Sequence, residues 1–261
     1  MLTEVLISTM NQTDFSLLDR MHIQSKAVVI NQCGRTGRSS ISYKGNEILW
    51  IDSDEVGLSK SRNMALRNAT GDICLLADDD EILVDKYPEV IQAVFENTMI
   101  SVARFAIKGI EAEFKKYDEK PCNIGYLKSL KMSSVEIAFR KDDIIKNEIF
   151  FDEALGAGSE FLMGEENAFL FSLLRKRLKI QYVPEVIALL HIGNSTWFTG
   201  YNESFFIGKG AAFTAMSKKM AIPFIYQFAF RKRYLYCQQM GTIKAIKYML
   251  EGRKRYLSIE R

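Results

Sequence analysis

The chain lacks the patterns that mark several common classes of protein. Its four cysteines are scattered and form no C-x-x-C pair, which argues against a zinc cluster and fits a reducing cytosol. No apolar run reaches the roughly 20 residues of a membrane-spanning helix. The N-terminal MLTEVLISTMNQTDF has no basic stretch followed by an apolar stretch of signal-peptide length. We therefore expect a cytoplasmic protein.

A Walker A motif is also absent, because CGRTGRSS (33–40) has neither its spacing nor its lysine. What the chain does have is length and apolar content, since 261 residues with 48% hydrophobic residues suffice for one large domain or a domain with an appendage.

Charge is unevenly distributed along the chain. From Ser204 onward there are 12 Lys/Arg and 2 Asp/Glu, a net charge of +10, whereas the preceding residues carry a net charge of −7. An acidic body thus carries a basic tail.

Short apolar runs alternate with helical stretches in the first half of the chain. We predict strands over 4–9, 26–32, 47–53, 72–77 and 100–107, with helices over 14–21, 58–69 and 86–98. The second half continues with a strand and short helix over 134–147, a glycine-rich loop over 151–164, a helix over 165–178 and a strand over 180–191. This alternation is typical of a mostly parallel sheet covered by helices.

An aspartate triplet, Asp78–Asp80, follows the predicted strand 72–77 directly. Adjacent carboxylates repel each other and lose hydration when they are partly buried, so this turn needs a positive partner. In parallel sheets ligands bind outside the carboxyl ends of the strands, where Thr9 and Asn31 also lie in this prediction. Mg²⁺ and Mn²⁺ commonly share one or two protein carboxylates with substrate phosphates. A metal site is one interpretation of the triplet, and a solvated acidic turn is the other.

Two other enzyme classes also place a D-x-D pattern after a strand. Phosphatases of the haloacid-dehalogenase type need Thr or Val two positions after the second aspartate, where this chain has Ile82. Nucleotidyltransferases carry a phosphate loop rich in glycine and arginine after the first strand, where this chain has TMNQTDF (9–15). Both classes are disfavoured and remain alternatives.

Two longer segments resemble the family 2 glycosyltransferases of the GT-A fold. They are GLSKSRNMALRNATGDICLLADDDE (57–81) and FDEALGAGSEFLMGEENAFLFSLLRKRLKIQYVPEVIALLH (151–191). Each motif alone is weak, but their order and spacing over residues 4–196 are specific, and they look most like bacterial capsular and exopolysaccharide enzymes. The resemblance implies a GT-A-like (Rossmann-like) α/β fold, with a mixed, mostly parallel sheet flanked by helices and a C-terminal helical extension.

The resemblance also implies a division into domains and an activity. Residues 1–200 would form the glycosyltransferase domain, with a nucleotide-sugar half over about 1–108 and an acceptor half over about 109–200, and residues 201–261 would form the extension. The implied activity is an inverting, metal-dependent transfer from a nucleoside-diphosphate sugar, with a UDP-sugar favoured, to a hydroxyl of a glycan acceptor in bacterial surface polysaccharide synthesis.

The same resemblance assigns the metal and its ligands. Asp80 would bind Mn²⁺ or Mg²⁺ directly, and Asp78 would contact the ribose or a metal-bound water. Asp79, between them, would face solvent. His191, at the end of the last predicted strand, would complete the metal site through a neutral imidazole. A hydrogen-bonded structural histidine is the alternative.

In the family, the second acid of a G-E-D motif is the general base, and here GEEN (164–167) places Glu166 at that position. Glu165 would bind the acceptor sugar, or the two glutamates would exchange roles. Acids that match the dipole in the first turn of a helix are the plain alternative. Because Glu166 stands where the family has aspartate, a catalytically silent relative that binds nucleotide or glycan also stays open.

Three further residues are assigned to the donor. Arg62 would reach the diphosphate, because a guanidinium fits phosphate oxygens; a surface arginine is the alternative. Thr9 and Asn31 would line the base and ribose pocket. Many relatives have an aspartate where Asn31 or Gln32 stands, and that carboxylate reads uracil. Because this chain lacks that aspartate, the nucleobase of the donor is left open, with UDP as the default.

The tail IPFIYQFAFRKRYLYCQQMGTIKAIKYMLEGRKRYL (222–257) mixes aromatic and basic residues. This composition suits the surface of a membrane, where a polyprenyl-diphosphate-linked acceptor would be found. The enzyme would then be peripheral at the inner face of the cell membrane. An ordinary helical cap that packs on the body is the other interpretation. Nucleic acid is disfavoured, because nothing else in the chain supports it.

Overall fold

The computed structural model describes residues 1–192 and 200–259, and it shows two units that each combine separate stretches of sequence. The first unit contains Met1–Val56, Lys60–Phe150 and Leu173–Asn194. The second contains Gly57–Ser59, Phe151–Ser172 and Ser195–Arg261. Of the two segments that resemble the glycosyltransferases, residues 57–59 and 151–172 therefore lie in the second unit. Residues 60–81 and 173–191 lie in the first unit.

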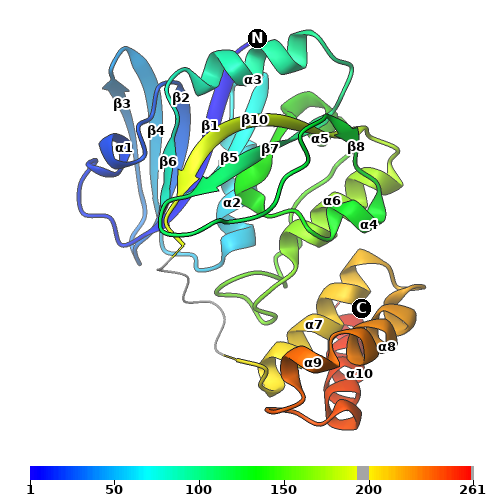
Figure 1. The fold of residues 1–261 in the computed structure, drawn as a ribbon. Helices are drawn as coiled ribbons and strands as arrows, with labels where there is room; N and C mark the ends of the chain where they lie inside the picture. The colour runs from blue at the N-terminus through cyan, green and yellow to red at the C-terminus, as the bar shows by residue number, and fades with distance from the viewer. Residues whose placement is uncertain (193–199, 260–261) are drawn as a thin grey trace. The chain divides into compact units, whose positions relative to one another are not determined.

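One sheet forms the centre of the first unit and has ten strands over the described residues (Figure 1). Its order is β3-β4-β2-β1-β5-β9-β7-β10-β6, and β8 pairs with β10. The strands are β1 (Thr3–Met10), β2 (Lys26–Gln32), β3 (Gly37–Tyr43), β4 (Asn46–Ser53), β5 (Ile73–Asp78), β6 (Glu81–Leu83), β7 (Val102–Gly109), β8 (Cys122–Asn123), β9 (Ile137–Arg140) and β10 (Ile180–Leu190). The predicted mixed α/β sheet flanked by helices is confirmed.

Parallel pairing is concentrated in one block of the sheet. Strands β4, β2, β1 and β5 are parallel neighbours, and β7 and β10 form a further parallel pair. The pairs made by β3, β6, β8 and β9 are antiparallel. The parallel block brings the carboxyl ends of four strands to one edge, which is where ligands of such sheets bind.

Helices cover both faces of this sheet, and Figure 1 shows α2 and α3 on opposite sides of it. The helices of this part of the chain are α1 (Leu17–Arg20), α2 (Leu58–Asn68), α3 (Tyr87–Glu96), α4 (Tyr126–Ser129) and α5 (Lys141–Lys146). Helix α3 buries Tyr87, Ile91 and Phe95, which recur every four residues and so share one face. They belong to the same core as Val5 and Ile7 of β1, whose side chains point to one face of the sheet.

The second unit is largely helical, in agreement with the predicted helical extension. Its elements are the start of α6 (Glu165–Arg175), then α7 (Glu203–Met216), α8 (Ala221–Arg231), α9 (Arg233–Tyr236) and α10 (Thr242–Ile259). Phe206 and Tyr236, both fully buried, lie in its main apolar core together with Met249. Among the described residues, no helix has both the length and the apolar character needed to cross a membrane.

Glycines allow α7 and α10 to pack closely against each other. A Cβ atom at Gly210 would lie 1.8 Å from the carbonyl oxygen of Met249. A Cβ atom at Gly252 would lie 1.9 Å from the carbonyl oxygen of Ile207. Atoms cannot approach this closely, so each helix needs a glycine where the backbone of the other crosses it.

Replacing Gly210 by alanine should therefore lower the free energy of unfolding of the second unit by about 2–3 kcal/mol, because overpacking forces the helices apart. Urea denaturation followed by circular dichroism would measure the loss. Gly241→Ala is the matched control, since an added Cβ there has no atom within 4 Å. Equal stability of the two variants would contradict the close crossing.

Candidate active site

The parallel register brings the predicted donor residues to one edge of the sheet. Ser8 of β1 is the partner of Asp78 of β5, and Thr9 is the partner of Asn31 of β2. In turn, Asn31 is the partner of Asp52 at the end of β4. Four strands thus contribute polar side chains to the same edge.

Asp78 is held by a buried arginine. The Arg62 guanidinium, from α2 and only 2% exposed, donates from Nη2 to Asp78 Oδ1 at 3.0 Å and to Ser134 Oγ at 2.8 Å. The Ser134 hydroxyl in turn donates to Asp78 Oδ2 at 3.5 Å. Arg62 is therefore not a surface residue, and the described contacts of Nη2 serve to orient Asp78. The contact of Arg62 with a diphosphate stays a prediction.

Asp79 is exposed, as expected for the middle residue of the triplet, but it also has a structural contact. Thr9 Oγ1 donates to Asp79 Oδ2 at 2.5 Å, and Gln12 Nε2 donates to Thr9 Oγ1 at 2.9 Å. The loops that follow β1 and β5 are tied together by this chain of hydrogen bonds. The Thr9 hydroxyl predicted to line the donor pocket is thereby fixed in place.

The acidic turn is short of positive charge. Burial raises the pKa of Asp80 to about 6, and the charges of Asp78 and Asp79 act in the same direction. Next to it, burial raises the pKa of Glu81 well above its usual range. Glu81 Oε1 accepts the Asp78 N–H at 2.7 Å, whereas Oε2 is buried and has no hydrogen-bond partner among the described residues. The carboxylate oxygens of Asp78 and Asp80 are of the type that a hard divalent cation prefers as ligands.

Asn31 is fully buried and its amide is engaged on both sides. Its Nδ2 donates to Asp52 Oδ1 at 2.8 Å and to the Gln12 carbonyl at 3.0 Å, and its Oδ1 accepts the Gln12 N–H at 2.9 Å. Asp52 also accepts from Trp50 Nε1 at 3.1 Å and from Arg35 Nε at 2.9 Å. Burial opposes ionisation of Asp52, but these hydrogen bonds outweigh it and lower the pKa. Asn31 is therefore fixed at this edge of the sheet, where Asp52 supplies a carboxylate.

His191 lies beside the acidic turn. Its backbone N–H donates to the Asp80 carbonyl at 3.2 Å, and its Nδ1 lies 2.8 Å from Glu111 Oε1. The other oxygen, Glu111 Oε2, accepts the Ile192 N–H at 2.8 Å. A carboxylate on one ring nitrogen is the usual support of a metal-binding histidine, since it fixes the tautomer and the ring orientation. Across the described ranges, no three Asp, Glu, His or Cys side chains are arranged to hold a metal by themselves.

Glu165 and Glu166 open α6 and belong to the second unit. Glu165 is buried, and Glu166 is half-buried. Three glycines shape the loop before them, because Gly156, Gly158 and Gly164 have φ of +100°, +77° and +91°. A Cβ at Gly164 would lie 2.4 Å from the Cβ of Ala212, so the loop passes close to α7. The first turn of α6 is thereby fixed against its own unit.

Lys209 of α7 belongs to the same unit as Glu166 and interacts with its charge. Its Nζ lies 5.5 Å from the ring centroids of both Phe213 and Phe228. Burial lowers the pKa of Lys209, while the charge of Glu166 acts in the opposite direction. A cation is therefore placed where it interacts favourably with the ionised form of Glu166.

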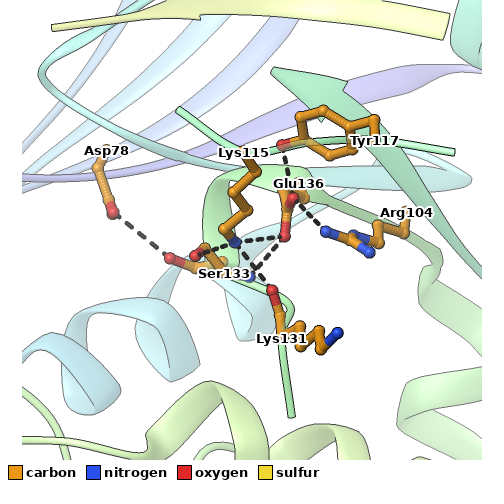
Figure 2. A network of polar contacts seen from close by, with 8 residues as sticks. Asp78, Arg104, Lys115, Tyr117, Lys131, Ser133 and Glu136 are labelled. Atoms are coloured by element: carbon orange, nitrogen blue, oxygen red, sulfur yellow. Dashed lines mark hydrogen bonds and ion pairs between the residues drawn. The ribbon is translucent and has the colours of Figure 1, made fainter. Parts of the chain in front are cut away.

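A buried carboxylate, Glu136, organises the segment that follows β7 (Figure 2). Four donors converge on it: Arg104 Nη2 at 2.8 Å, Lys115 Nζ at 3.0 Å, Tyr117 OH at 2.6 Å and Ser133 N–H at 2.6 Å. Lys115 also donates to Ser133 Oγ at 2.7 Å. Because Ser134 contacts Asp78, this network lies directly beside the acidic turn.

Glu136→Gln should lower the free energy of unfolding of the first unit by about 2 kcal/mol, because two cations lose a charged hydrogen-bond partner. Glutamine keeps the size of the side chain, so packing changes little. Urea denaturation of both proteins measures the difference. The exposed Glu113 supplies the matched control, Glu113→Gln. If both variants unfold at the same urea concentration, the network does not stabilise this segment.

The fold and the acidic edge of the sheet define a protein of the GT-A class, and comparison with solved structures agrees. The 1–349 fragment of S. aureus TarS in complex with UDP-GlcNAc is 15% identical with a TM-score of 0.65, covering 92% of this chain and 74% of that one. Its complex with UDP gives a TM-score of 0.62 with the same coverage, and TarS itself gives 0.62, covering 90% of this chain and 44% of that one. At this identity the likeness shows the fold.

The family comes from the sequence comparison. Residues 30–159 match the family model "Glycosyl transferase family 2". No curated protein sequence matches the chain significantly. With the shared fold, the match identifies the chain as a family 2 glycosyltransferase, as the resemblance predicted.

Proposed function

We propose that this enzyme transfers a sugar from a nucleoside-diphosphate sugar, most favourably a UDP-sugar, to a hydroxyl of a glycan acceptor with inversion at the anomeric carbon. One observation carries the proposal: the acidic turn lies at the carboxyl edge of β5, beside Thr9 and Asn31, and is short of positive charge. TarS, which shares the fold, is solved with UDP-GlcNAc and with UDP, and this supports a UDP-sugar donor.

The donor would be held at the edge formed by β1, β2, β4 and β5. Asp80 and Asp78 would bind Mn²⁺ or Mg²⁺, with His191 as a further ligand supported by Glu111. When bound, the ion supplies positive charge that stabilises the leaving nucleoside diphosphate. Arg62 keeps the Asp78 carboxylate in one orientation, so less ordering is left to be done when the donor arrives.

Glu166 would be the general base of the transfer. Its carboxylate takes the proton from the acceptor hydroxyl as that oxygen bonds to the anomeric carbon, and the bond from that carbon to the diphosphate oxygen breaks. Attack from the face opposite the leaving group inverts the configuration. The N-terminal position on α6 and the charge of Lys209 both favour the ionised carboxylate. Glu165, adjacent in the first turn, would bind the acceptor sugar.

The acceptor is proposed to be a growing bacterial surface glycan of the capsular or exopolysaccharide type, carried on polyprenyl diphosphate. Support comes from the resemblance of 57–81 and 151–191 to such enzymes. The enzyme would then act in the cytoplasm at the inner face of the cell membrane.

Thermal shift of the purified protein with UDP, GDP, dTDP and CMP, each with and without Mn²⁺, tests the donor site. A ligand that binds only the folded state raises the melting temperature by mass action. We expect a rise with UDP that requires Mn²⁺, followed by release of UDP from a UDP-sugar in the presence of acceptor. A shift with Mg²⁺ or a phosphate mimic alone would instead favour a phosphatase. UDP binding without turnover of any UDP-sugar would favour a silent relative.

A further inference from the structure

Helix α8 is apolar on two sides, although only one side is covered. Its inner residues Ala221, Ile225 and Ala229 are buried in the core of the second unit. Phe224 and Phe228 are partly buried against the same core, whereas Ile222, Tyr226 and Phe230 are exposed. A helix that is apolar all round is normally buried, so the outer side of α8 is unusual for a surface helix.

The exposed apolar residues form a regular row. Ile222, Tyr226 and Phe230 recur every four residues on α8, and the rings of Tyr226 and Phe230 are stacked with centroids 6.4 Å apart. Helix α8 ends at its C-cap Lys232, whose φ of −103° and ψ of 9° lie outside the helical region, and α9 follows with the exposed Tyr234. Phe230 is 65% exposed and Tyr234 is 70% exposed.

We name this region the α8–α9 outer surface, defined by six exposed side chains: Met220, Ile222, Tyr226, Phe230, Tyr234 and Leu235. Exposed basic residues precede and follow the row, namely Lys218, Lys219, Arg231, Lys232 and Arg233. No Asp or Glu occurs anywhere between Ser204 and Leu250. The α8–α9 outer surface therefore combines exposed apolar side chains with basic residues, on two helices that carry no acid of their own.

We propose that the α8–α9 outer surface binds the surface of an anionic membrane. The apolar side chains would enter the boundary between head groups and acyl chains, where Tyr is favoured, and the flanking cations would meet lipid phosphates. Three of the six side chains of the α8–α9 outer surface are aliphatic, namely Met220, Ile222 and Leu235. Aliphatic side chains match hydrocarbon better than the faces of nucleobases. The strong positive charge requires an anionic partner, which acidic phospholipid supplies over a wide area.

This inference goes beyond the transferase reaction and does not depend on it, because membrane binding is measured without donor or acceptor. Flotation of the full chain with phosphatidylcholine vesicles, with and without phosphatidylglycerol, is the test. We expect binding only when phosphatidylglycerol is present, and release as the salt concentration rises, since salt screens the attraction. Loss of donor turnover alongside retained flotation would affect only the proposed function.

Two variants separate the apolar and the charged contributions. Tyr226→Ser with Phe230→Ser, and Arg231→Gln with Lys232→Gln and Arg233→Gln, should each reduce vesicle partitioning by about 10- to 100-fold. Leu127→Ser is the matched control, since Leu127 is 80% exposed in the first unit and should leave partitioning unchanged. Melting temperatures show that the variants are folded.

Several results would overturn the proposal. They are absence of flotation with phosphatidylglycerol vesicles, equal flotation with pure phosphatidylcholine, and unchanged flotation of the two variants. Self-association through this surface, or binding of single-stranded RNA to it, in a protein that does not float with vesicles would assign it to a second copy of the chain or to nucleic acid instead.

Discussion

Replacing Glu166 by glutamine is expected to lower kcat for sugar transfer by about 10²- to 10⁴-fold, which is the range that a general base contributes. Glutamine has nearly the same shape but cannot take the proton of the acceptor hydroxyl. The Kd for UDP should not change, because the residues assigned to the donor, such as Asp80, belong to the first unit. Steady-state release of UDP gives kcat, and a UDP titration in the presence of Mn²⁺ gives the Kd.

Glu165→Gln is the matched control, because it makes the same change one residue earlier in the same helix. Glu165 is proposed to bind the acceptor, so its variant should raise the KM for the acceptor more than it lowers kcat. Full activity of Glu166→Gln with an inactive Glu165→Gln would exchange the two roles. Full activity of both would move the base to another residue.

Much of the sheet could be predicted from the sequence, because its central strands contain uninterrupted apolar runs. Residues 27–30 and 73–77 are all apolar, as is typical of strands buried on both faces. Strand β3 gave no such signal, since GRSSISY is largely exposed and pairs only with β4 on the described path of the sheet. Strand β6 is three residues long and begins at Glu81, so the neighbouring aspartates conceal it.

The candidate site was partly predictable for a different reason. Strand order alone places Thr9, Asn31 and Asp78 at one edge, because the carboxyl ends of parallel strands meet there. The sequence does not predict which side chains contact each other at this edge. The contacts from Arg62 to Asp78 and from His191 to Glu111 join residues 16 and 80 positions apart, and composition does not encode such pairings.

Glu136 shows the same limit more clearly. In the sequence it ends SSVE (133–136), a capping-box pattern that accounts for the Ser133 N–H alone, yet the structure makes it the acceptor for four donors. Only the approach of the segment after β7 to the turn before β9 reveals its role. Long-range polar contacts of this kind require the fold, and they determine how rigidly the acidic turn is held.

Replacing Asp80 by asparagine is expected to abolish the Mn²⁺ dependence of UDP binding. Mutating a residue that only supports a metal ligand commonly lowers metal affinity by about 10- to 100-fold. Loss of a direct ligand should weaken the binding of UDP with Mn²⁺ by more than that. The protein without ligand should become more stable, because a neutral amide relieves the repulsion among three adjacent carboxylates. Calorimetric titration with UDP, with and without Mn²⁺, measures the first effect, and the melting temperature measures the second.

Asp79→Asn separates a metal ligand from a neighbouring charge. Asp79 is exposed and accepts from Thr9, so its amide variant removes one negative charge from the same turn without removing a proposed ligand. It should keep the Mn²⁺ dependence of UDP binding. If Asp80→Asn and Asp79→Asn both retain that dependence, the cation is not held by this turn. If both lose it equally, the turn attracts the ion through its total charge, and Asp80 has no special place as a ligand.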